Sequence, residues 1–407
     1  MPFLLAIVVR RARAATERRL ARGTIRTVWA STPILTLPIL AECDRLLGLR
    51  SASLVFNTYY ITRSFDINLF VFEAAVRLTR NGRALRNFRR IVLAWALLRF
   101  DVFHYFYDRG LMISDGRFGI HPEELQLLFD SGKRLYTYAY GADVRSQEIT
   151  LRLGEPNICQ ECPQPGRYCI CKTEDLNSSL ERLEGRVTAR IAMGDMVSYV
   201  PGCRNMHYWP LDLKKFKAEP PVYRSGDTLR VAHAPNHGHF KGTRFLIEAI
   251  EKLRHEGQPI ELVSVQGVPN EKVIELFKAS HLIADQFIAG FHGYTALEAM
   301  ALARPVLCFL RSDDMMIDPA TCPIINVRPE QVYGLLKQCL EGGVDLESLG
   351  KRGREYIDRY YCVEAVSARL GRMYIETAGF SEVVNGKLQS RVDQLERNCV
   401  ASGHVAA

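Results

Sequence analysis

Two segments in the second half of the chain combine charged side chains with glycines at the start of predicted helices. The first covers residues 234 to 243 and places Lys241, Gly242 and Thr243 directly before an amphipathic stretch. A lysine and exposed backbone N–H groups at a helix start are suited to binding a pyrophosphate group. Taken on its own, the segment is also consistent with an exposed turn that carries a solvated lysine.

The second segment covers residues 290 to 301 and places Glu298 in the first turn of an otherwise apolar helix. Gly290 and Gly293 would allow this loop to approach a ligand closely. An acid near a helix start can simply favour the helix dipole. The neighbours of Glu298 are alanine, leucine and methionine, however, so we expect its carboxylate to be partly buried. A buried carboxylate needs hydrogen-bond partners, which two ribose hydroxyls would supply.

A third segment, residues 159 to 171, holds four of the eleven cysteines: Cys159, Cys162, Cys169 and Cys171. The Cys-x2-Cys pair is a usual half of a tetrahedral zinc site. The Cys-x-Cys pair requires a turn, because residues two apart are a full repeat apart along a strand. Disulfides, unligated thiols and an iron–sulfur cluster are the alternatives. We expect one structural zinc ion bound by the four thiolates.

The N-terminal segment is strongly basic. Residues 1 to 26 contain seven arginines and one acid, Glu17. This composition predicts a basic arm that lies on an anionic membrane surface. The alternatives are a solvated first helix, a start codon placed too far upstream, and a nucleic-acid arm. We expect no nucleic acid partner, because no recognition motif accompanies the arm.

Two apolar runs are poor candidates for membrane insertion. The run 3–9 lacks a preceding basic region and a small-residue cleavage site, so it is a poor signal peptide. The run 91–98 is too short to span a bilayer, and arginines bracket it. We therefore expect a cytoplasmic protein with reduced cysteines, in peripheral contact with the inner face of the cell membrane through its arm.

The elements around these segments alternate in a regular way. Short apolar strands alternate with amphipathic helices through the 407 residues, which is typical of parallel sheets covered by helices. The length and the 47% hydrophobic content fit two domains of about 200 residues each. A charged, proline-bearing stretch at 214–221 is the predicted junction. Strands are predicted at 27–31, 53–56, 101–104, 134–138, 229–233, 260–265, 282–287 and 305–309.

The second half resembles a known family. The motifs Lys241-Gly242-Thr243, Glu298-Ala299-Met300-Ala301 and Pro305-Val306 resemble the donor half of family-4-type retaining glycosyltransferases, also called glycosyl transferases group 1. The resemblance covers roughly residues 226 to 378. In the first half it is looser and depends on His104 and on segments 141–145, 192–196 and 209–212.

This resemblance implies the fold and its division. The implied fold is α/β of the GT-B type, with two doubly wound Rossmann-like domains facing each other across a cleft. The expected parts are the basic arm (1–26), an acceptor-side domain with the cysteine cluster (27–212), a linker (213–225), a nucleotide-sugar-binding domain with a closing helix (226–378) and a tail (379–407).

The resemblance also implies roles for individual residues. Lys241 should contact the donor phosphates, Glu298 should bind the ribose, and Gly293 should let the loop pass close to the nucleotide. The expected donor site comprises Asn236, Lys241, Gly242, Thr243, Gly293, Tyr294 and Glu298. The expected acceptor-side residues are Tyr140, Gly141, Asp143 and Arg145, and His104 joins Lys241 and Glu298 as a catalytic residue. The implied reaction is retaining and metal-independent, and the chain contains no Asp-x-Asp motif.

Three positions depart from the family pattern. Gly290, Asn236 and Tyr140 stand where the family often has a glutamate, an arginine and a histidine. Some subgroups share the missing glutamate and carry an Asp-Gln pair like Asp285-Gln286. The predicted function is transfer of a sugar from a nucleotide-sugar donor to a glycan or lipid-linked acceptor in cell-envelope polysaccharide synthesis. The alternatives are a non-catalytic glycosyltransferase-like binding or assembly subunit, and a sugar-nucleotide 2-epimerase.

Overall fold

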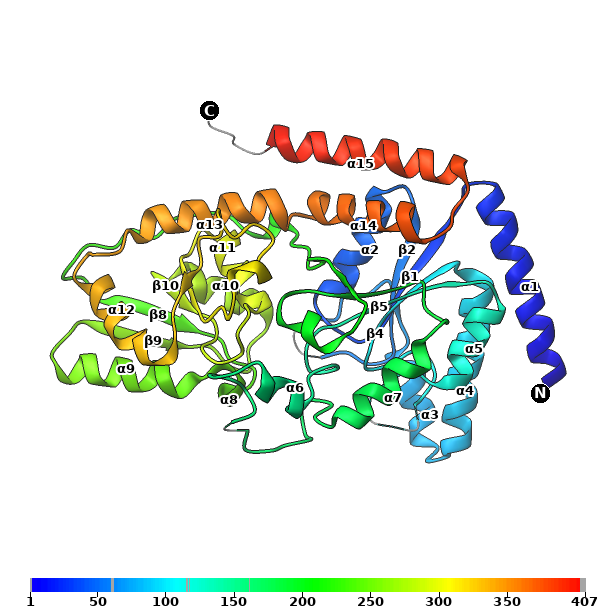
Figure 1. The fold of residues 1–407 in the computed structure, drawn as a ribbon, viewed down its shortest axis with the longest axis horizontal. Helices are drawn as coiled ribbons and strands as arrows, with labels where there is room; N and C mark the ends of the chain where they lie inside the picture. The colour runs from blue at the N-terminus through cyan, green and yellow to red at the C-terminus, as the bar shows by residue number, and fades with distance from the viewer. Residues whose placement is uncertain (1, 60–61, 115, 117, 161, 403–407) are drawn as a thin grey trace. The chain divides into compact units, whose positions relative to one another are not determined.

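The computed structural model describes residues 2–59, 62–114, 116, 118–160 and 162–402 of the chain (Figure 1). Within this range the chain divides into two compact units. Unit 1 consists of the described residues of Met1–Ser146, Gly166–Pro210 and Val363–Asn398, and unit 2 of the described residues of Gln147–Pro165, Leu211–Cys362 and Cys399–Ala407. Each unit is built around one sheet.

Unit 1 contains a seven-stranded sheet in the order β3-β2-β1-β4-β5-β6-β7, and its neighbouring strands pair in parallel. The chain adds β2 and β3 on one side of β1 and then returns to place β4 on the other side. The strand order therefore reverses between β1 and β4, which is the position where open α/β sheets form ligand sites. The strands are β1 (Arg26–Ser31), β2 (Arg50–Val55), β3 (Ile67–Asn68), β4 (Val102–Phe106), β5 (Arg134–Tyr138), β6 (Ala189–Ala192) and β7 (Arg204–Asn205).

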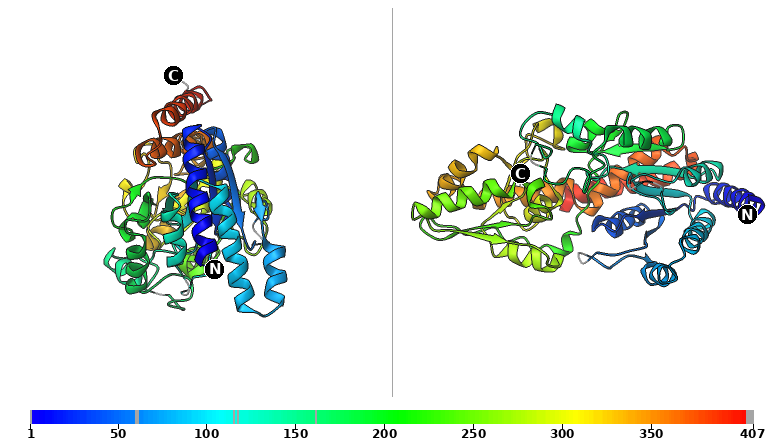
Figure 2. Two further views of the ribbon diagram at one scale, coloured as in Figure 1. Left: turned by 90° about the vertical axis from the view of Figure 1, so that its right-hand side faces the viewer. Right: turned by 90° about the horizontal axis from the view of Figure 1, so that it is seen from below.

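The helices of unit 1 follow from local sequence signals. The side chain of Asn81 caps α4 by accepting hydrogen bonds from two backbone N–H groups, and Pro122 at the first position of α5 suits a helix start. Figure 2 shows the helices around the sheet. They are α1 (Pro2–Ala21), α2 (Thr36–Leu46), α3 (Phe70–Leu78), α4 (Gly82–Arg99), α5 (Pro122–Asp130), α7 (Thr173–Leu183), α14 (Val363–Thr377) and most of α15 (Glu382–Ser402), with the 3-10 turn η1 (Gly194–Tyr199).

The segment predicted to be a basic arm forms α1 and packs on unit 1, in contact with α4 and α5. Asp101, which is fully buried, accepts hydrogen bonds from the Thr16 hydroxyl at 2.7 Å and from Arg19 Nη2 at 2.7 Å. The Nζ atom of Lys133 donates to the same Thr16 hydroxyl at 2.6 Å. Arg19 is thus part of a buried polar network, whereas Arg18 on the same helix is exposed.

Unit 2 contains a five-stranded parallel sheet in the order β12-β11-β10-β8-β9. Here the order reverses between β8 and β10. The strands are β8 (Leu229–His233), β9 (Ile260–Ser264), β10 (Leu282–Ala284), β11 (Val306–Cys308) and β12 (Ile325–Asn326). The helices are α6 (Gln147–Arg152), α8 (Gly238–Lys241), α9 (Thr243–His255), α10 (Asn270–Lys278), α11 (Tyr294–Ala301), α12 (Val332–Leu340) and α13 (Leu346–Tyr360), with 3-10 turns η2 (Leu213–Lys215), η3 (Asp313–Met315) and η4 (Pro329–Gln331).

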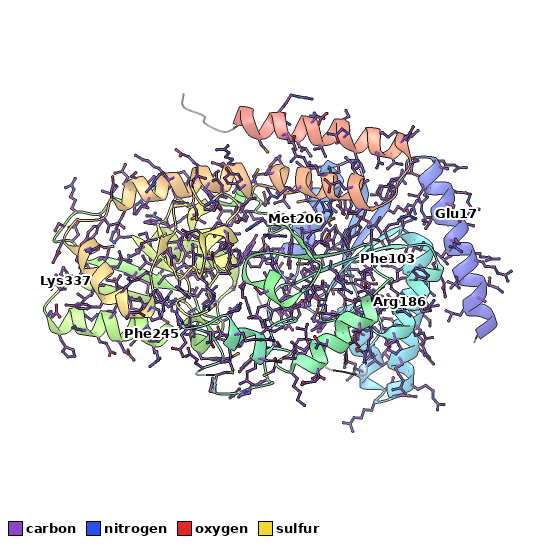
Figure 3. All side chains as sticks on the ribbon, in the orientation of Figure 1. Glu17, Phe103, Arg186, Met206, Phe245 and Lys337 are labelled. Carbon is purple, nitrogen blue, oxygen red and sulfur yellow. The ribbon has the colours of Figure 1, made fainter. Side chains whose placement is uncertain are left out.

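The core of unit 2 forms where α9 and α12 cover the sheet. Leu246, Ile250 and Leu253 recur at helical spacing along α9 and are buried together with Leu229 of β8 and Leu336 of α12. Figure 3 shows Phe245 on α9 and Lys337 on α12 in unit 2, and Phe103 inside unit 1. Two parallel sheets with alternating helices confirm the predicted α/β class.

The apolar run 91–98 lies in α4, which is part of the folded unit 1. None of the helices in the described part of the chain has both the length and the apolar character needed to cross a membrane.

The network at Asp101 generates a first prediction. Replacing Arg19 by alanine removes the charged partner of a fully buried carboxylate, so the free energy of unfolding should fall by about 3 kcal/mol. Urea denaturation followed by tryptophan fluorescence measures unit 1 specifically, because Trp29, Trp95 and Trp209 all lie in it. The matched control is Arg18→Ala on the exposed face of α1, which should change stability by no more than about 0.5 kcal/mol. Equal stability of the two variants would contradict the prediction.

Candidate functional site

A candidate ligand site lies at the carboxyl end of the unit 2 sheet, where the strand order reverses. The neighbouring strands β8 and β10 end in register, with His233 opposite Ala284. Asp285 follows β10 directly. Ligands of open α/β sheets bind at the carboxyl edge of such a reversal point. Both segments with predicted donor-site residues lie beside it.

An ion pair holds the two segments together. Asp285 is 1% exposed, and its Oδ1 atom pairs with Nζ of Lys241. Its Oδ2 atom accepts a hydrogen bond from the backbone N–H of Gly293 at 2.5 Å. A buried carboxylate is stable only when such partners satisfy it. The Lys241 side chain is 14% exposed, so it is mostly buried but not fully enclosed.

Position 293 is a glycine because the ion pair leaves little room for a side chain there. Its φ is −90°, which any residue adopts. A Cβ atom there would lie 2.9 Å from Lys241 Nζ and 3.1 Å from Asp285 Oδ1. Gly242 differs, because its φ of +67° lies in the left-handed region that favours glycine. One glycine therefore leaves room for the ion pair, and the other allows the turn between α8 and α9.

His233 connects the strand ends to α9. Its Nδ1 atom lies 2.8 Å from the carbonyl oxygen of Ala284, and its Nε2 atom lies 2.8 Å from the hydroxyl of Thr243. Burial lowers the pKa of this imidazole to about 4, so it is neutral at pH 7. Since a carbonyl only accepts, Nδ1 carries the proton and Nε2 accepts from Thr243. His233 was not among the predicted site residues, although a histidine at a strand end before a glycine-bearing turn is a usable signal.

Glu298 is buried, as predicted from its apolar neighbours. Its Oε1 atom accepts a hydrogen bond from Asn270 Nδ2 at 2.7 Å. Burial raises the pKa of this carboxyl to about 7, against the opposing effects of the Asn270 hydrogen bond and the Lys241 charge. Asn270, the first residue of α10, was not among the predicted site residues, because no motif distinguishes it in the sequence.

The remaining predicted donor-site residues are more peripheral. Asn236 is exposed in the turn before α8, and Tyr294 is half-buried at the start of α11. Gly290 has a φ of +87°, and a Cβ atom there would lie 2.9 Å from Arg311 Nε. The backbone and Arg311 together leave no room for a longer side chain at position 290 unless Arg311 moves.

The predicted acceptor-side residues form a loop in unit 1, after β5, in which Gly141 and Asp143 are buried and Tyr140 and Arg145 are half-buried. Asp143 accepts hydrogen bonds from the backbone N–H groups of Tyr140 at 3.0 Å and Gly141 at 2.9 Å. Burial, and then the nearby negative charge of Asp108, raises the pKa of Asp143 to about 8. Arg145 forms two hydrogen bonds with the Asp195 carboxylate, at 2.9 and 3.0 Å. The fold thus brings these predicted residues together.

His104 lies within β4 and is fully buried, whereas its position in the sequence suggested a strand end. Its ring stacks on Trp29 with centroids 3.9 Å apart. Its Nδ1 atom lies 3.1 Å from the Tyr138 hydroxyl, and its Nε2 atom lies 3.0 Å from the Tyr374 hydroxyl. These stacking and hydrogen-bonding contacts show that His104 is a core residue of unit 1. Its catalytic role stays a prediction.

The predicted zinc site is not supported. Among the residues that the structure describes, no group of three or more His, Cys, Asp and Glu side chains is arranged to hold a metal ion. Cys159, Cys162, Cys169 and Cys171 lie in the irregular stretch between α6 and α7. The backbone N–H of Cys159 donates to the Asn157 side chain in unit 2, whereas Cys171 pairs with Ser146 in unit 1. Cysteine spacing alone does not fix how the thiols are arranged in such an irregular stretch.

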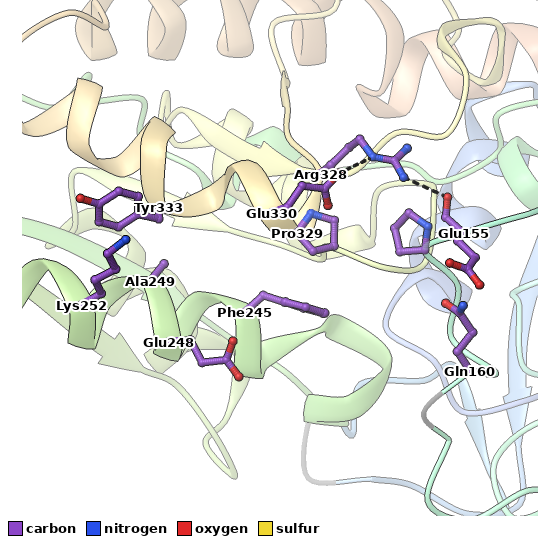
Figure 4. A pocket seen from close by; sticks show the side chains of 11 residues that line it. Glu155, Gln160, Phe245, Glu248, Ala249, Lys252, Arg328, Pro329, Glu330 and Tyr333 are labelled. Atoms are coloured by element: carbon purple, nitrogen blue, oxygen red, sulfur yellow. Dashed lines mark hydrogen bonds and ion pairs between the residues drawn. The ribbon is translucent and has the colours of Figure 1, made fainter.

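A pocket of about 540 Å³ lies elsewhere in unit 2, between α9 and η4 (Figure 4). Phe245 and Lys252 line it on one side, and Arg328 and Tyr333 on the other. Lys252 Nζ lies 3.8 Å from the centre of the Tyr333 ring. Neither Lys241 nor Glu298 lines this pocket, so it is distinct from the site at the strand ends.

Comparisons with known proteins identify the fold. No protein-family model matches the chain, and no curated protein is similar to it in sequence. HepE of Anabaena, solved with UDP and glucose, is 9% identical with a TM-score of 0.53, and the match covers 86% of this chain and 98% of that one. Sucrose-phosphate synthase of Thermosynechococcus elongatus is 12% identical with a TM-score of 0.54, at the same coverage of both chains. The chain has a GT-B glycosyltransferase fold. At such low identity the likeness establishes the GT-B fold alone.

The buried Glu298 generates a second prediction. Its carboxyl holds a proton in the folded protein up to about pH 7, but releases it near pH 4.5 when unfolded. The folded state thus binds more protons between these values, so the free energy of unfolding should fall as the pH rises through this range. In Glu298→Gln this titrating carboxyl is absent, so the free energy of unfolding should depend less on pH between about 4.5 and 7.

Thermal unfolding between pH 4 and 8 tests this prediction. The control is Glu248→Gln, which changes an exposed glutamate on α9 and should follow the wild-type curve. Parallel curves for Glu298→Gln and the wild type would show that Glu298 does not titrate in this range.

Proposed function

We propose that the protein is a glycosyltransferase that moves a sugar from a nucleotide-sugar donor to a glycan or lipid-linked acceptor. The observation that carries the proposal is the cluster of Lys241, Asp285 and Gly293 at the strand-order reversal of a GT-B fold. Similar structures give independent support, since HepE was solved with UDP-glucose. We place the donor diphosphate beside Lys241.

The ion pair suits this role. An ammonium group has three N–H bonds, and Asp285 Oδ1 accepts one of them. Asp285 thus orients the Lys241 side chain beside the loop, and the other two N–H bonds of the ammonium can donate to phosphate oxygens. The negative charge that develops on a departing diphosphate is stabilised by a cation held in place before the reaction. Lys241 is therefore the proposed catalytic cation, and the chemistry requires no metal and no protein nucleophile.

Glu298 and Asn270 are the proposed ribose contacts. The hydrogen bond from Asn270 occupies Oε1 and orients the carboxylate. Ribose hydroxyls would donate to the ionised form of Glu298 and lower its pKa, because hydrogen bonds to the charged form favour it. In the proposed retaining reaction, the acceptor hydroxyl approaches the same face of the sugar that the diphosphate leaves. The acceptor-side loop of unit 1, with Tyr140 and Asp143, is the proposed contact for the acceptor.

The crowding at Gly290 favours a second candidate function. Arg311 fills the space beside Gly290, where the family that the chain resembles often has a sugar-binding glutamate. Asn236 is exposed at a position where that family commonly has an arginine. A non-catalytic subunit that binds the nucleotide sugar would keep Lys241 and Glu298 without these groups. Turnover of any nucleotide sugar by the purified protein distinguishes the enzyme from the binding subunit.

Removal of Lys241 is the direct test of the donor site. Lys241→Ala should weaken nucleotide-sugar binding by about 1.5–3 kcal/mol, which is the contribution of a charged hydrogen bond. Calorimetric titration with UDP-, GDP-, ADP- and CMP-linked sugars first identifies the donor and then measures the loss. The control is Lys351→Ala, which removes an exposed lysine of α13 and should bind the donor like the wild type.

Lys241→Ala also leaves Asp285 buried without its cation, which lowers stability. The double variant Lys241→Ala/Asp285→Asn removes both charges and keeps an oxygen to accept from Gly293. Its donor affinity should be as low as that of Lys241→Ala, with more of the stability restored. Wild-type donor affinity in this folded double variant would refute the placement of the diphosphate.

A further inference from the structure

Exposed apolar side chains are concentrated in one part of the described chain. Half of the large apolar residues exposed there lie in α3 and α4 of unit 1. These two consecutive helices contact each other, and Figure 2 shows them side by side. We call residues 70–99 the α3–α4 hairpin. A soluble surface rarely gathers large apolar groups in this way unless it has a partner.

The apolar residues of α4 form a stripe. Ile91, Trp95 and Leu98 follow the spacing i, i+4, i+7, which places them on one face of the helix, and they are 68%, 42% and 40% exposed. Leu93 and Leu97 of the same helix are buried. The stripe is therefore an outer face, opposite the residues that attach α4 to unit 1.

Helix α3 repeats the arrangement. Val71 and Leu78 are seven residues apart and are 73% and 83% exposed. The buried face of α3 carries Glu73, whose carboxylate pairs with Arg77 at 2.7 Å and with Arg89 of α4 at 2.6 Å. This ion pair joins the two helices through their inner faces, so both stripes remain exposed.

Positive charge surrounds these stripes. The α3–α4 hairpin contains one acid, Glu73, and seven arginines: Arg77, Arg80, Arg83, Arg86, Arg89, Arg90 and Arg99. Arg89 is used in the Glu73 contact, and Arg90 pairs with Glu123. Arg80, Arg83, Arg86 and Arg99 are exposed, at the tip of the hairpin and at the end of α4.

We propose that the α3–α4 hairpin docks on the surface of an anionic lipid bilayer. Exposed Trp, Ile and Leu side chains at helical spacing match the boundary between headgroups and acyl chains, and arginines beside them match anionic headgroups. A protein partner would need an acidic, apolar face of complementary shape, whereas a bilayer supplies both properties at every point. The proposal moves the main lipid contact from the predicted basic arm to the hairpin. It does not depend on the proposed glycosyltransferase activity.

Vesicle flotation of the full-length protein tests the proposal. The probe is phosphatidylcholine vesicles with about one third phosphatidylglycerol, compared with pure phosphatidylcholine. The wild type should float with the anionic vesicles at low salt and far less at about 0.5 M salt, where charges are screened. Ile91→Glu/Trp95→Glu should lower the partition coefficient at least about tenfold, because it places two acids in the buried contact.

Matched controls separate this contact from general effects. Val222→Glu/Val383→Glu changes two exposed apolar residues outside the hairpin and should float like the wild type. Arg83→Glu/Arg86→Glu should lose vesicle binding. The control Arg182→Glu/Arg186→Glu makes the same charge change at two exposed arginines in and beside α7, and it should lose much less binding. All these positions are exposed, but Trp95 also packs edge-on against Phe100. Thermal unfolding of every variant is therefore measured beside flotation, and only folded protein is compared.

Two results would overturn the proposal. One is flotation of Ile91→Glu/Trp95→Glu equal to that of the Val222→Glu/Val383→Glu control. The other is a wild-type protein that does not bind anionic vesicles but self-associates in sedimentation velocity, with self-association lost in Ile91→Glu/Trp95→Glu. That result would assign the hairpin to a contact between two copies of the chain.

Discussion

The buried ion pair between Asp285 and Lys241 is the constraint on which the candidate site depends. A carboxylate with 1% exposure loses nearly all of its hydration, so it requires a cation and hydrogen-bond donors nearby. Lys241 comes from the turn between α8 and α9, and the second donor is the backbone of Gly293 before α11. Satisfying one acid therefore fixes three segments at one edge of the sheet.

The two units use the carboxyl ends of their strands differently. In unit 2 the strand ends carry the Lys241 ammonium paired with buried Asp285, beside a neutral histidine. In unit 1 the corresponding loops carry buried acids, and Asp143 is held by backbone N–H groups with its pKa raised to about 8. Such a loop is suited to hydroxyl groups, which exchange hydrogen bonds with a carboxyl group in either protonation state.

Much of the candidate site could be predicted because it follows strand ends directly. The positions of Lys241, Gly293 and Glu298 relative to apolar strands placed them at one sheet edge, and the apolar neighbours of Glu298 predicted its burial, which the structure confirms. The α/β class followed from the same alternation. Periodicity and helix-start signals are local properties, so they are readable in one sequence.

Contacts between distant segments decided the rest. The sequence by itself determined the alternation of strands and helices and the residue types at their ends. Only the tertiary structure showed that Arg19 reaches a buried acid 82 residues away and that His104 is enclosed by aromatic rings. It also showed that the described cysteines form no group arranged to hold a metal ion. It also decided which face of α4 is exposed. These outcomes depend on which surfaces come into contact when the chain folds. Burial, ion pairing and metal binding are set by those tertiary contacts, and spacing along the chain does not specify them.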